Sequence, residues 1–234
     1  MLRLFKFKLA NVYFQIRLIF KSVAIVDNSN FDARSNSDVA ELLPFLFILA
    51  RFNNPQCILE LGTRGGESTK VLLKVCELAG VKGRSVDLSP APDWLCNNSS
   101  WDHFVSDDIE FARNLARRKL WPNGEIFYGI DFLFIDTSHE YLHTKEELAQ
   151  YWPLINSGGL LVFHDTNLRN RPTWKLSRKL NWGWNNQRGV TRAIEEFFTL
   201  NINEELLQVK TDVNAFEFLF NIPWNNGLCA IKKN

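Results

Sequence analysis

Short apolar runs alternate with amphipathic segments along most of the chain. Each run spans four or five positions and borders on polar residues, which is typical of strands buried inside an α/β sheet. The predicted strands cover 57–61, 83–87, 103–106, 132–136, 160–164 and 228–232, and the predicted helices cover 69–79, 108–119, 144–152 and 190–200. Because strands that alternate with helices build a parallel sheet covered on both faces, we predict a single doubly wound, Rossmann-like, mostly parallel sheet.

The first 26 residues show a different pattern, with five cations and no acid. Their apolar residues recur at three- and four-residue steps, as on one stripe of a helix. The stripe consists of Leu2, Phe5, Leu9, Val12, Ile16, Ile19 and Val23. Such a helix either packs on the domain or on a second subunit, which would make a homodimer, or lies on an anionic membrane surface.

A polar loop over 27–38 and a helix over 39–52, capped by Ser37 or Asp38, follow this segment. The sequence therefore divides into an N-terminal helical extension, residues 1–54, and an α/β domain, residues 55–234.

Composition narrows the class of protein. The chain has 234 residues, a formal net charge of +1 and 46% hydrophobic residues, as in an ordinary globular domain. The near-neutral charge gives no general argument for nucleic-acid binding. Four cysteines without close pairs favour a reduced, cytoplasmic setting, and no apolar run reaches the length of a membrane span. We expect a cytoplasmic protein, peripheral on the inner membrane surface if residues 1–26 bind lipid.

A glycine-rich turn follows the first predicted strand, within Glu60-Leu61-Gly62-Thr63-Arg64-Gly65-Gly66. Glycines at a strand-to-helix turn let the backbone approach a ligand, and the amides at the helix start can receive polar groups. Asp87 ends the next strand, where a carboxylate can accept hydrogen bonds from ribose hydroxyls. The turn lacks the GxGxxG pattern of dinucleotide dehydrogenases and fits ExGxxxG instead.

This pattern resembles the class I S-adenosylmethionine-dependent methyltransferases. The resemblance implies S-adenosylmethionine as cofactor, with the glycine turn facing its methionine part. It also implies that Glu60 supports the loop, that Asp87 binds the ribose and that Asp107, after the third strand, contacts the adenine. The implied cofactor residues are Glu60, Gly62, Thr63, Gly66, Ser68, Asp87 and Asp107.

Acids and histidines follow the next two predicted strands. Asp136 and His139 come after one strand, and His164 and Asp165 end its neighbour. Adjacent parallel strands would bring these groups to one rim, where they could hold a hard divalent cation such as Mg²⁺. A cation there would lower the pKa of a substrate hydroxyl, and His139 could remove its proton.

The motif from Asp136 to Tyr141, together with Phe163-His164-Asp165, resembles the subgroup of sugar and macrolide O-methyltransferases and cephalosporin hydroxylase-like proteins. The resemblance implies a metal site of Asp136, His164 and Asp165, with Asp136 and His139 catalytic and Tyr141 on the substrate side. The sequence departs from some members at Ser138, where they carry a second acid, and at His164, where others carry Asp or Glu.

Residues 166–194 contain seven cations, no acid and three tryptophans. A lid of this composition would suit an anionic sugar or glycoside, and we assign Arg169, Trp182 and Trp184 to substrate binding. A solvated basic face or a single-stranded nucleic-acid surface are the alternatives.

The leading hypothesis is therefore a metal-assisted O-methyltransferase acting on a hydroxyl of a sugar or glycosylated small molecule. A hydroxylase-like relative of the same fold, and a non-catalytic module that binds membranes through residues 1–26, are the other two hypotheses.

Overall fold

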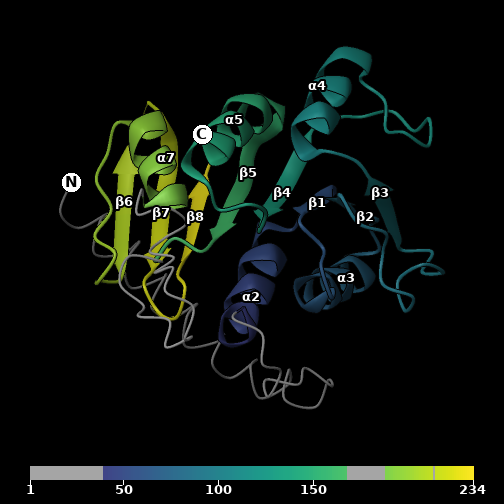
Figure 1. Cartoon of the computed structure of the whole chain (residues 1–234), viewed down its shortest axis with the longest axis horizontal. Helices are drawn as coiled ribbons and strands as arrows, with labels where there is room; N and C mark the ends of the chain where they lie inside the picture. The colour runs from purple at the N-terminus through teal and green to yellow at the C-terminus, as the bar shows by residue number, and fades with distance from the viewer. Residues whose placement is uncertain (1–38, 168–187, 213) are drawn as a thin grey trace, which may run out of the picture.

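The apolar runs form the centre of an eight-stranded mixed sheet in the computed structural model, which describes residues 39–167, 188–212 and 214–234 (Figure 1). The strand order is β3-β2-β1-β4-β5-β8-β7-β6, with β1 to β5 parallel and the last three strands antiparallel to their neighbours. The strands are β1 Ile58–Leu61, β2 Gly83–Asp87, β3 Trp101–Val105, β4 Ile130–Ile135, β5 Ile155–His164, β6 Gln208–Asp212, β7 Phe216–Ile222 and β8 Leu228–Lys232. The predicted α/β fold with a mostly parallel core is confirmed.

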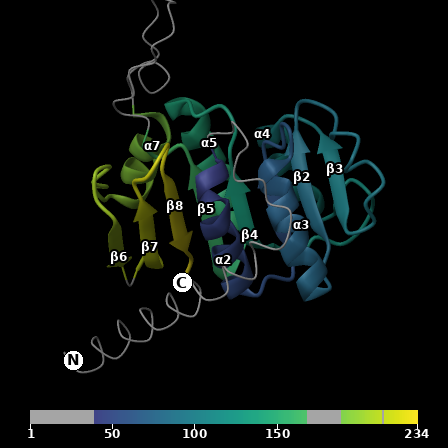
Figure 2. The same cartoon turned by 90° about the horizontal axis from the view of Figure 1, so that it is seen from below.

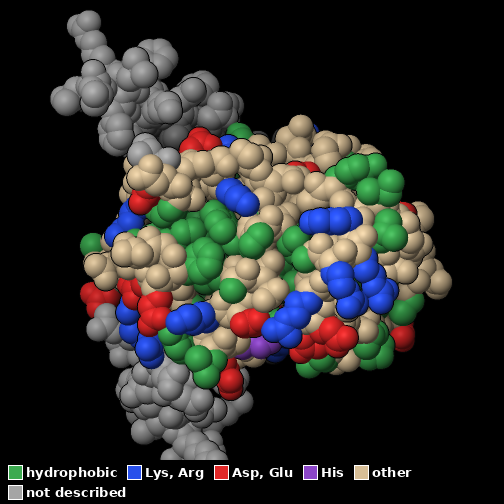
Figure 3. Space-filling model, turned by 90° about the horizontal axis from the view of Figure 1, so that it is seen from above, with side chains coloured by type: hydrophobic (Ala, Val, Ile, Leu, Met, Phe, Trp, Pro, Cys, Tyr) green, Lys and Arg blue, Asp and Glu red, His purple; other side chains and the backbone are tan. Residues whose placement is uncertain are grey.

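Helices cover both faces of this sheet. Figure 2 shows α2 and α3 on one face, and Figure 3 shows the opposite face, which α4, α5 and α7 cover with charged side chains of both signs around apolar surface. The helices are α2 Leu43–Asn53, α3 Glu67–Ala79, α4 Asp108–Arg118, α5 Tyr141–Tyr151 and α7 Gly189–Phe198, with short 3-10 turns at Ala40–Leu42 and Trp152–Leu154. None of the helices in the described residues is long and apolar enough to cross a membrane.

Helix α2 is part of the domain core, although it lies within the predicted extension 1–54. Its Leu46 and Ala50 are fully buried and belong to one apolar cluster with Ile58 of β1, Phe132 of β4 and Leu160 of β5. The amphipathic segment 1–26 and the proposed caps at Ser37 and Asp38 lie outside the described residues.

The order of the parallel strands creates a switch point. From β1 the chain proceeds outward to β2 and β3, and it then returns to place β4 and β5 on the other side of β1. In open α/β sheets the crevice for ligands lies at the carboxyl ends of the strands at such a point. The loops after β1 and β4 therefore mark the place to look for a site.

The structure corrects the sequence interpretation in two places. The hairpin of β6 and β7 was not predicted; its strands are joined at Asp212, whose Oδ1 accepts hydrogen bonds from the amides of Asn214 and Ala215. The strand predicted over 160–164 begins earlier, at Ile155, so Ser157-Gly158-Gly159 lie inside β5. There Gly158 N donates to Lys233 O and Lys233 N donates to Gly159 O, so the C-terminal residues extend the pairing.

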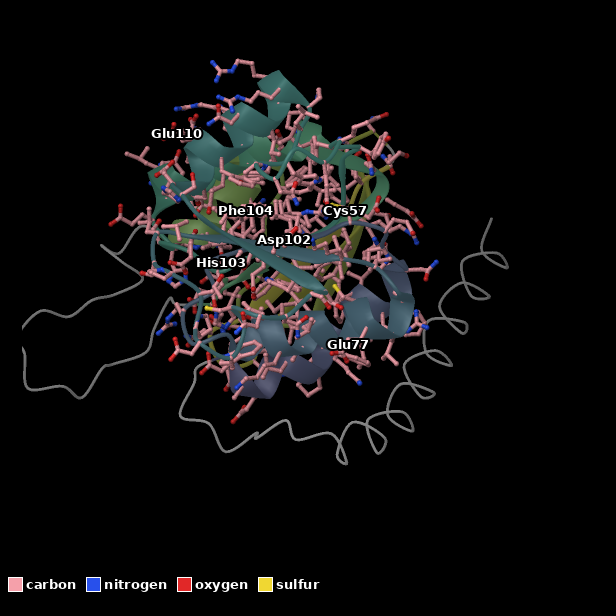
Figure 4. All side chains as sticks on the ribbon, turned by 90° about the vertical axis from the view of Figure 1, so that its right-hand side faces the viewer. Cys57, Glu77, Asp102, His103, Phe104 and Glu110 are labelled. Carbon is pink, nitrogen blue, oxygen red and sulfur yellow. The ribbon has the colours of Figure 1, made fainter. Side chains whose placement is uncertain are left out.

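Strand β3 forms one edge of the sheet, seen between α4 and α3 in Figure 4. Successive side chains point to opposite faces: Phe104 packs against Phe111 of α4, whereas His103 faces Ser85, with Nδ1 to Oγ at 2.9 Å. His103 Nε2 also lies 2.9 Å from Ser89 O. His103 is therefore held by hydrogen bonds within the fold.

Candidate active site

The glycine turn after β1 is built into close contact with the loop after β4. Gly62 has φ +86°, and a Cβ on it would lie 2.1 Å from the carbonyl oxygen of Asp136. Its amide donates to Val86 O of β2 at 2.9 Å. Only glycine combines this conformation with this approach, so the turn and Asp136 hold a fixed relative position.

Asp87 is fastened to the same turn by backbone amides. Its Oδ2 accepts from Thr63 N at 2.7 Å and Arg64 N at 3.1 Å, and its Oδ1 accepts from Ser89 N at 2.8 Å. Although partial burial opposes ionisation, these hydrogen bonds lower the pKa of Asp87. The predicted ribose acceptor is thus a fixed carboxylate beside the glycine turn.

Gly66 begins α3, where the structure adds a residue that the sequence did not single out. Gly66 has φ +83°, and a Cβ on it would lie 2.4 Å from the ring of Trp94. The indole nitrogen of Trp94 donates to Gly65 O at 3.4 Å, and Lys70 Nζ lies 5.2 Å from the indole centroid. The tryptophan comes from the β2–β3 connection, and only the high aromatic content hinted at such a contact.

Glu60 supports the start of α3 from within the core. It is fully buried, and its Oε2 accepts a hydrogen bond from Thr69 Oγ1 at 2.6 Å, while Oε1 is buried and has no hydrogen-bond partner in the described part of the chain. Burial raises the pKa of Glu60 to about 8. Ser68 is also buried beside it at the first turn of α3.

We expect Glu60→Gln to stabilise the cofactor-free protein at alkaline pH. A carboxyl with a raised pKa keeps its proton in the folded state. Its contribution to the free energy of unfolding is therefore complete below pH 4.5 and is lost as pH rises through about 8. The neutral amide does not lose it. One unit of pKa shift corresponds to about 1.4 kcal/mol, so a gain on the order of 2–4 kcal/mol is expected above pH 8.

Urea unfolding of both proteins at pH 5 and pH 8.5 measures this gain. Glu110→Gln, on the exposed side of α4 (Figure 4), is the matched control and should change the free energy of unfolding by no more than a few tenths of a kcal/mol. An unchanged difference between wild type and Glu60→Gln at the two pH values would contradict a buried, protonated Glu60.

Asp107 caps the helix that follows β3. Its Oδ1 accepts a hydrogen bond from Glu110 N at 2.8 Å, and the residue is exposed at the carboxyl end of the sheet. The structure therefore places Asp107 on the same rim as Asp87, and its contact with adenine stays a prediction.

Asp136, His139, His164 and Asp165 converge at the ends of β4 and β5. His139 Nε2 lies 3.0 Å from Asp136 Oδ1 and 2.8 Å from Asp165 Oδ2. His164 Nδ1 lies 3.2 Å and 3.4 Å from the same two oxygens. The four residues that the sequence predicted at one rim thus form one cluster, and both imidazoles face both carboxylates.

Charge in this cluster is balanced internally. Burial opposes ionisation of Asp136, yet hydrogen bonds from His139 and His164 lower its pKa to about 2, and they lower the pKa of Asp165 as well. Burial also opposes protonation of the imidazoles, but the two carboxylates raise the pKa of His139 to about 9 and raise that of His164. At neutral pH the cluster holds two anions and two cations.

The backbone at this cluster is strained. His139 has φ +59° and Asp165 has φ +56°, in a region that side-chain-bearing residues seldom occupy. Helix α7 presses on the same loop, because a Cβ on Gly189 would lie 2.1 Å from His139 O. Strain of this kind persists where the surroundings enforce it and is concentrated at functional sites.

The donor set fits a divalent cation. Asp165 Oδ1 is buried without a hydrogen-bond partner among the described residues. Asp136, His139 and Asp165 each offer one ligand atom within 4.8 Å of the others. Neighbouring ligands of Mg²⁺ lie about 2.9 Å apart, close to the observed separations. His139, predicted as a base, therefore stands as close to the carboxylates as His164, the predicted ligand.

Of the four predicted substrate residues, Tyr141 lies in the described part of the chain and the other three do not. The Tyr141 hydroxyl donates to Glu196 of α7, and the guanidinium carbon of Arg192 lies 4.0 Å from the Tyr141 ring centroid. Tyr141 thus links α5 to α7 beside the cluster. Arg169, Trp182 and Trp184 lie outside the described residues, as does most of the predicted lid 166–194, whose last residues begin α7.

Sheet order, glycine turn, ribose acid and acidic rim together define a class I S-adenosylmethionine-dependent methyltransferase. Residues 59–166 match the family model described as a methyltransferase domain. Residues 125–218 match the model described as rhamnosyl O-methyltransferase/CmcI. Both family models describe methyltransferases, and together they match residues 59–218 of this chain, which supports an S-adenosylmethionine-dependent methyltransferase domain. No curated protein matches the sequence significantly.

Solved structures share the fold at low sequence identity. A Staphylococcus aureus protein assigned as a caffeoyl-CoA O-methyltransferase is 17% identical, with a TM-score of 0.60 over 94% of this chain and 99% of its own. The methyltransferase PaMTH1 of Podospora anserina, bound to SAH, is 15% identical, with a TM-score of 0.54 over 86% and 84%. MycE of the mycinamycin biosynthetic pathway, solved with Mg, SAH and mycinamycin VI, is 18% identical, with a TM-score of 0.51 over 84% of this chain and 48% of its own.

Proposed function

We propose that the protein is a metal-assisted O-methyltransferase that acts on a hydroxyl of a sugar or glycosylated small molecule. The observation that carries the proposal is the position of the acid and histidine cluster. The glycine turn that faces the cofactor touches the carbonyl of Asp136, so the cluster lies next to the methyl donor. An acceptor hydroxyl bound at the cluster would be close enough to the sulfonium methyl for in-line attack.

Methyl transfer to oxygen requires that the acceptor hydroxyl lose its proton. Asp136 and Asp165 would hold a Mg²⁺ ion, with His164 completing the protein ligands on the buried side. When bound, such an ion supplies a positive charge that orients the hydroxyl and lowers its pKa.

His139 is the residue that would take this proton. Its Nε2 points at the two carboxylates, whose negative charge keeps the imidazole protonated at neutral pH. With a cation held by Asp136 and Asp165, the pKa of His139 would fall toward its ordinary value, and its Nε2 could accept the proton of the hydroxyl. His139 would therefore act as a base only when a cation is bound at the two carboxylates.

The acceptor class rests on the comparisons and on the sequence of residues 166–194. The model described as rhamnosyl O-methyltransferase/CmcI names a sugar as the acceptor, and the MycE structure holds mycinamycin VI from a biosynthetic pathway. Arg169, Trp182 and Trp184 belong to a basic, tryptophan-rich stretch suited to anionic groups and sugar rings. A phosphorylated or carboxylated glycoside is the first acceptor to test.

Calorimetric titration with S-adenosylmethionine and S-adenosylhomocysteine, in Mg²⁺ and in EDTA, first measures whether the protein binds the methyl donor and its product. Radiolabelled S-adenosylmethionine is then incubated with matched anionic and neutral glycosides. We expect label in the glycoside, dependence on Mg²⁺ and a preference for the anionic member. Transfer of label that is indifferent to EDTA would overturn the metal, and an oxidised product without label would favour hydroxylase-like chemistry instead.

A further inference from the structure

A second mixed cluster of acids and a histidine lies behind the proposed active site, between α4 and α5. His143 Nε2 is 2.9 Å from Asp108 Oδ2 and 3.6 Å from Glu147 Oε1. Asp108 is the first residue of α4, and His143 and Glu147 lie one turn apart on α5. His143 and Asp108 lie 35 residues apart in the sequence, so the tertiary fold brings them together.

Burial makes this arrangement costly without a cation. The Glu147 side chain is fully buried, and its Oε2 has no hydrogen-bond partner among the described residues. Burial raises the pKa of Glu147 to about 7, with the neighbouring Asp108 carboxylate among the further causes. His143 can neutralise one carboxylate as an imidazolium, and the second carboxylate must then take up a proton or a cation.

The ligand atoms have the separations of a metal site. They all lie within 4.8 Å of one another, and the ligands of a tetrahedral Zn²⁺ ion are about 3.3 Å apart. The outer contacts that orient ligands are present as well. Thr137 Oγ1 donates to Glu147 Oε1 at 2.6 Å, and Ile109 N donates to Asp108 Oδ1 at 2.8 Å. His143 is 28% exposed, which leaves a route for an ion from solvent.

We propose that Asp108, His143 and Glu147 form a binding site for a divalent transition-metal ion, with Zn²⁺ as the best match. An imidazole nitrogen and two carboxylate oxygens form a mixed nitrogen and oxygen donor set, which Zn²⁺ binds well. The site is separate from the Asp136 cluster and does not depend on the function proposed above.

The position of the site suggests what a bound ion would stabilise. The site joins the first turn of α4, next to Asp107, to helix α5. Thr137, the residue after Asp136, donates a hydrogen bond to Glu147 of this site. Tyr151 of α5 already donates to Asp108 O at 2.7 Å, so the two helices meet at this point. An ion would tie the loop after β3 to the loop after β4.

Imidazole NMR of the full-length chain tests the proposal with Zn²⁺ alone as the probe. The His143 signal, assigned by its loss in His143→Gln, should move to the position of a metal-bound nitrogen on addition of Zn²⁺. Equilibrium dialysis should show one bound equivalent fewer in His143→Gln than in wild type. His103→Gln, which removes an imidazole outside the cluster, should bind as many equivalents as wild type.

Two controls keep the outcome decisive. Glu147→Gln keeps the size of the side chain and should weaken Zn²⁺ binding at this site at least tenfold, so it replaces His143→Gln if that variant melts at a much lower temperature. A His143 signal that does not respond to excess Zn²⁺, or equal stoichiometry in all variants, would overturn the proposal and leave an ion-paired hydrogen-bond network.

Discussion

Asp136→Asn is expected to abolish methyl transfer while S-adenosylmethionine still binds. The amide keeps the shape of the side chain but removes the charge that His139 and His164 face at 3.0 Å and 3.2 Å. Without that charge the cation site loses a ligand and His139 loses its orientation. Loss of such a group costs a factor on the order of 10³ or more in kcat.

Single-turnover assays measure the loss of methyl transfer, and calorimetry measures the affinity for S-adenosylmethionine. The affinity for S-adenosylmethionine should change by less than about threefold, because the glycine turn and Asp87 are unaltered. Asp102→Asn is the matched control: Asp102 lies on the edge strand β3 (Figure 4), where it pairs with Lys82 at 2.8 Å, and strands β2 and β1 separate it from β4. An Asp136→Asn protein with wild-type turnover would refute the proposed role of the cluster.

Gly62→Ala is expected to destabilise the fold and to lose cofactor binding together. The added methyl group would lie 2.1 Å from Asp136 O at a residue with φ +86°, so both contact and backbone conformation oppose it. Strain at positive φ and overpacking each cost about 1–3 kcal/mol, which gives roughly 2–6 kcal/mol in total. The affinity for S-adenosylmethionine should fall at least tenfold.

Gly80→Ala separates the two causes. Gly80 ends α3 with φ +68°, and a Cβ on it would meet nothing within 4 Å. It therefore carries the conformational penalty without the clash, and we expect a loss of about 1–2 kcal/mol with unchanged cofactor affinity. Equal losses of unfolding free energy in the two variants would show that the contact with Asp136 has no energetic weight.

The parallel half of the fold could be predicted from the sequence because its strands are short apolar runs between amphipathic helices. Strands β2 and β8 have the predicted bounds. The β6–β7 hairpin was missed because β6, Gln208–Asp212, is mostly polar and lies at the edge of the sheet. The glycines at 158 and 159 suggested a turn, but their backbone pairs with Lys233, a partner that the local sequence does not contain.

The sequence predicts those residues of the candidate site that lie directly at the end of a strand. Asp87, Asp136 and Asp165 are brought to one rim by strand order alone. The close approach of both imidazoles to both carboxylates depends on the left-handed backbone of His139 and Asp165, which the sequence does not specify. Trp94 comes from a loop, and its contact with Gly66 arises only from tertiary packing.

The contacts of Gly62 with Asp136 and of Gly189 with His139 have a consequence for engineering this chain. Methyltransferase loops are attractive units for exchange, since each follows its own strand. Here a cofactor loop, an acceptor loop and a helix start touch through backbone atoms, which no side-chain redesign can move. A graft that replaces one of the three without the others would import a mismatched backbone, so acceptor specificity should be transplanted as all three segments or by point substitutions that leave their glycines in place.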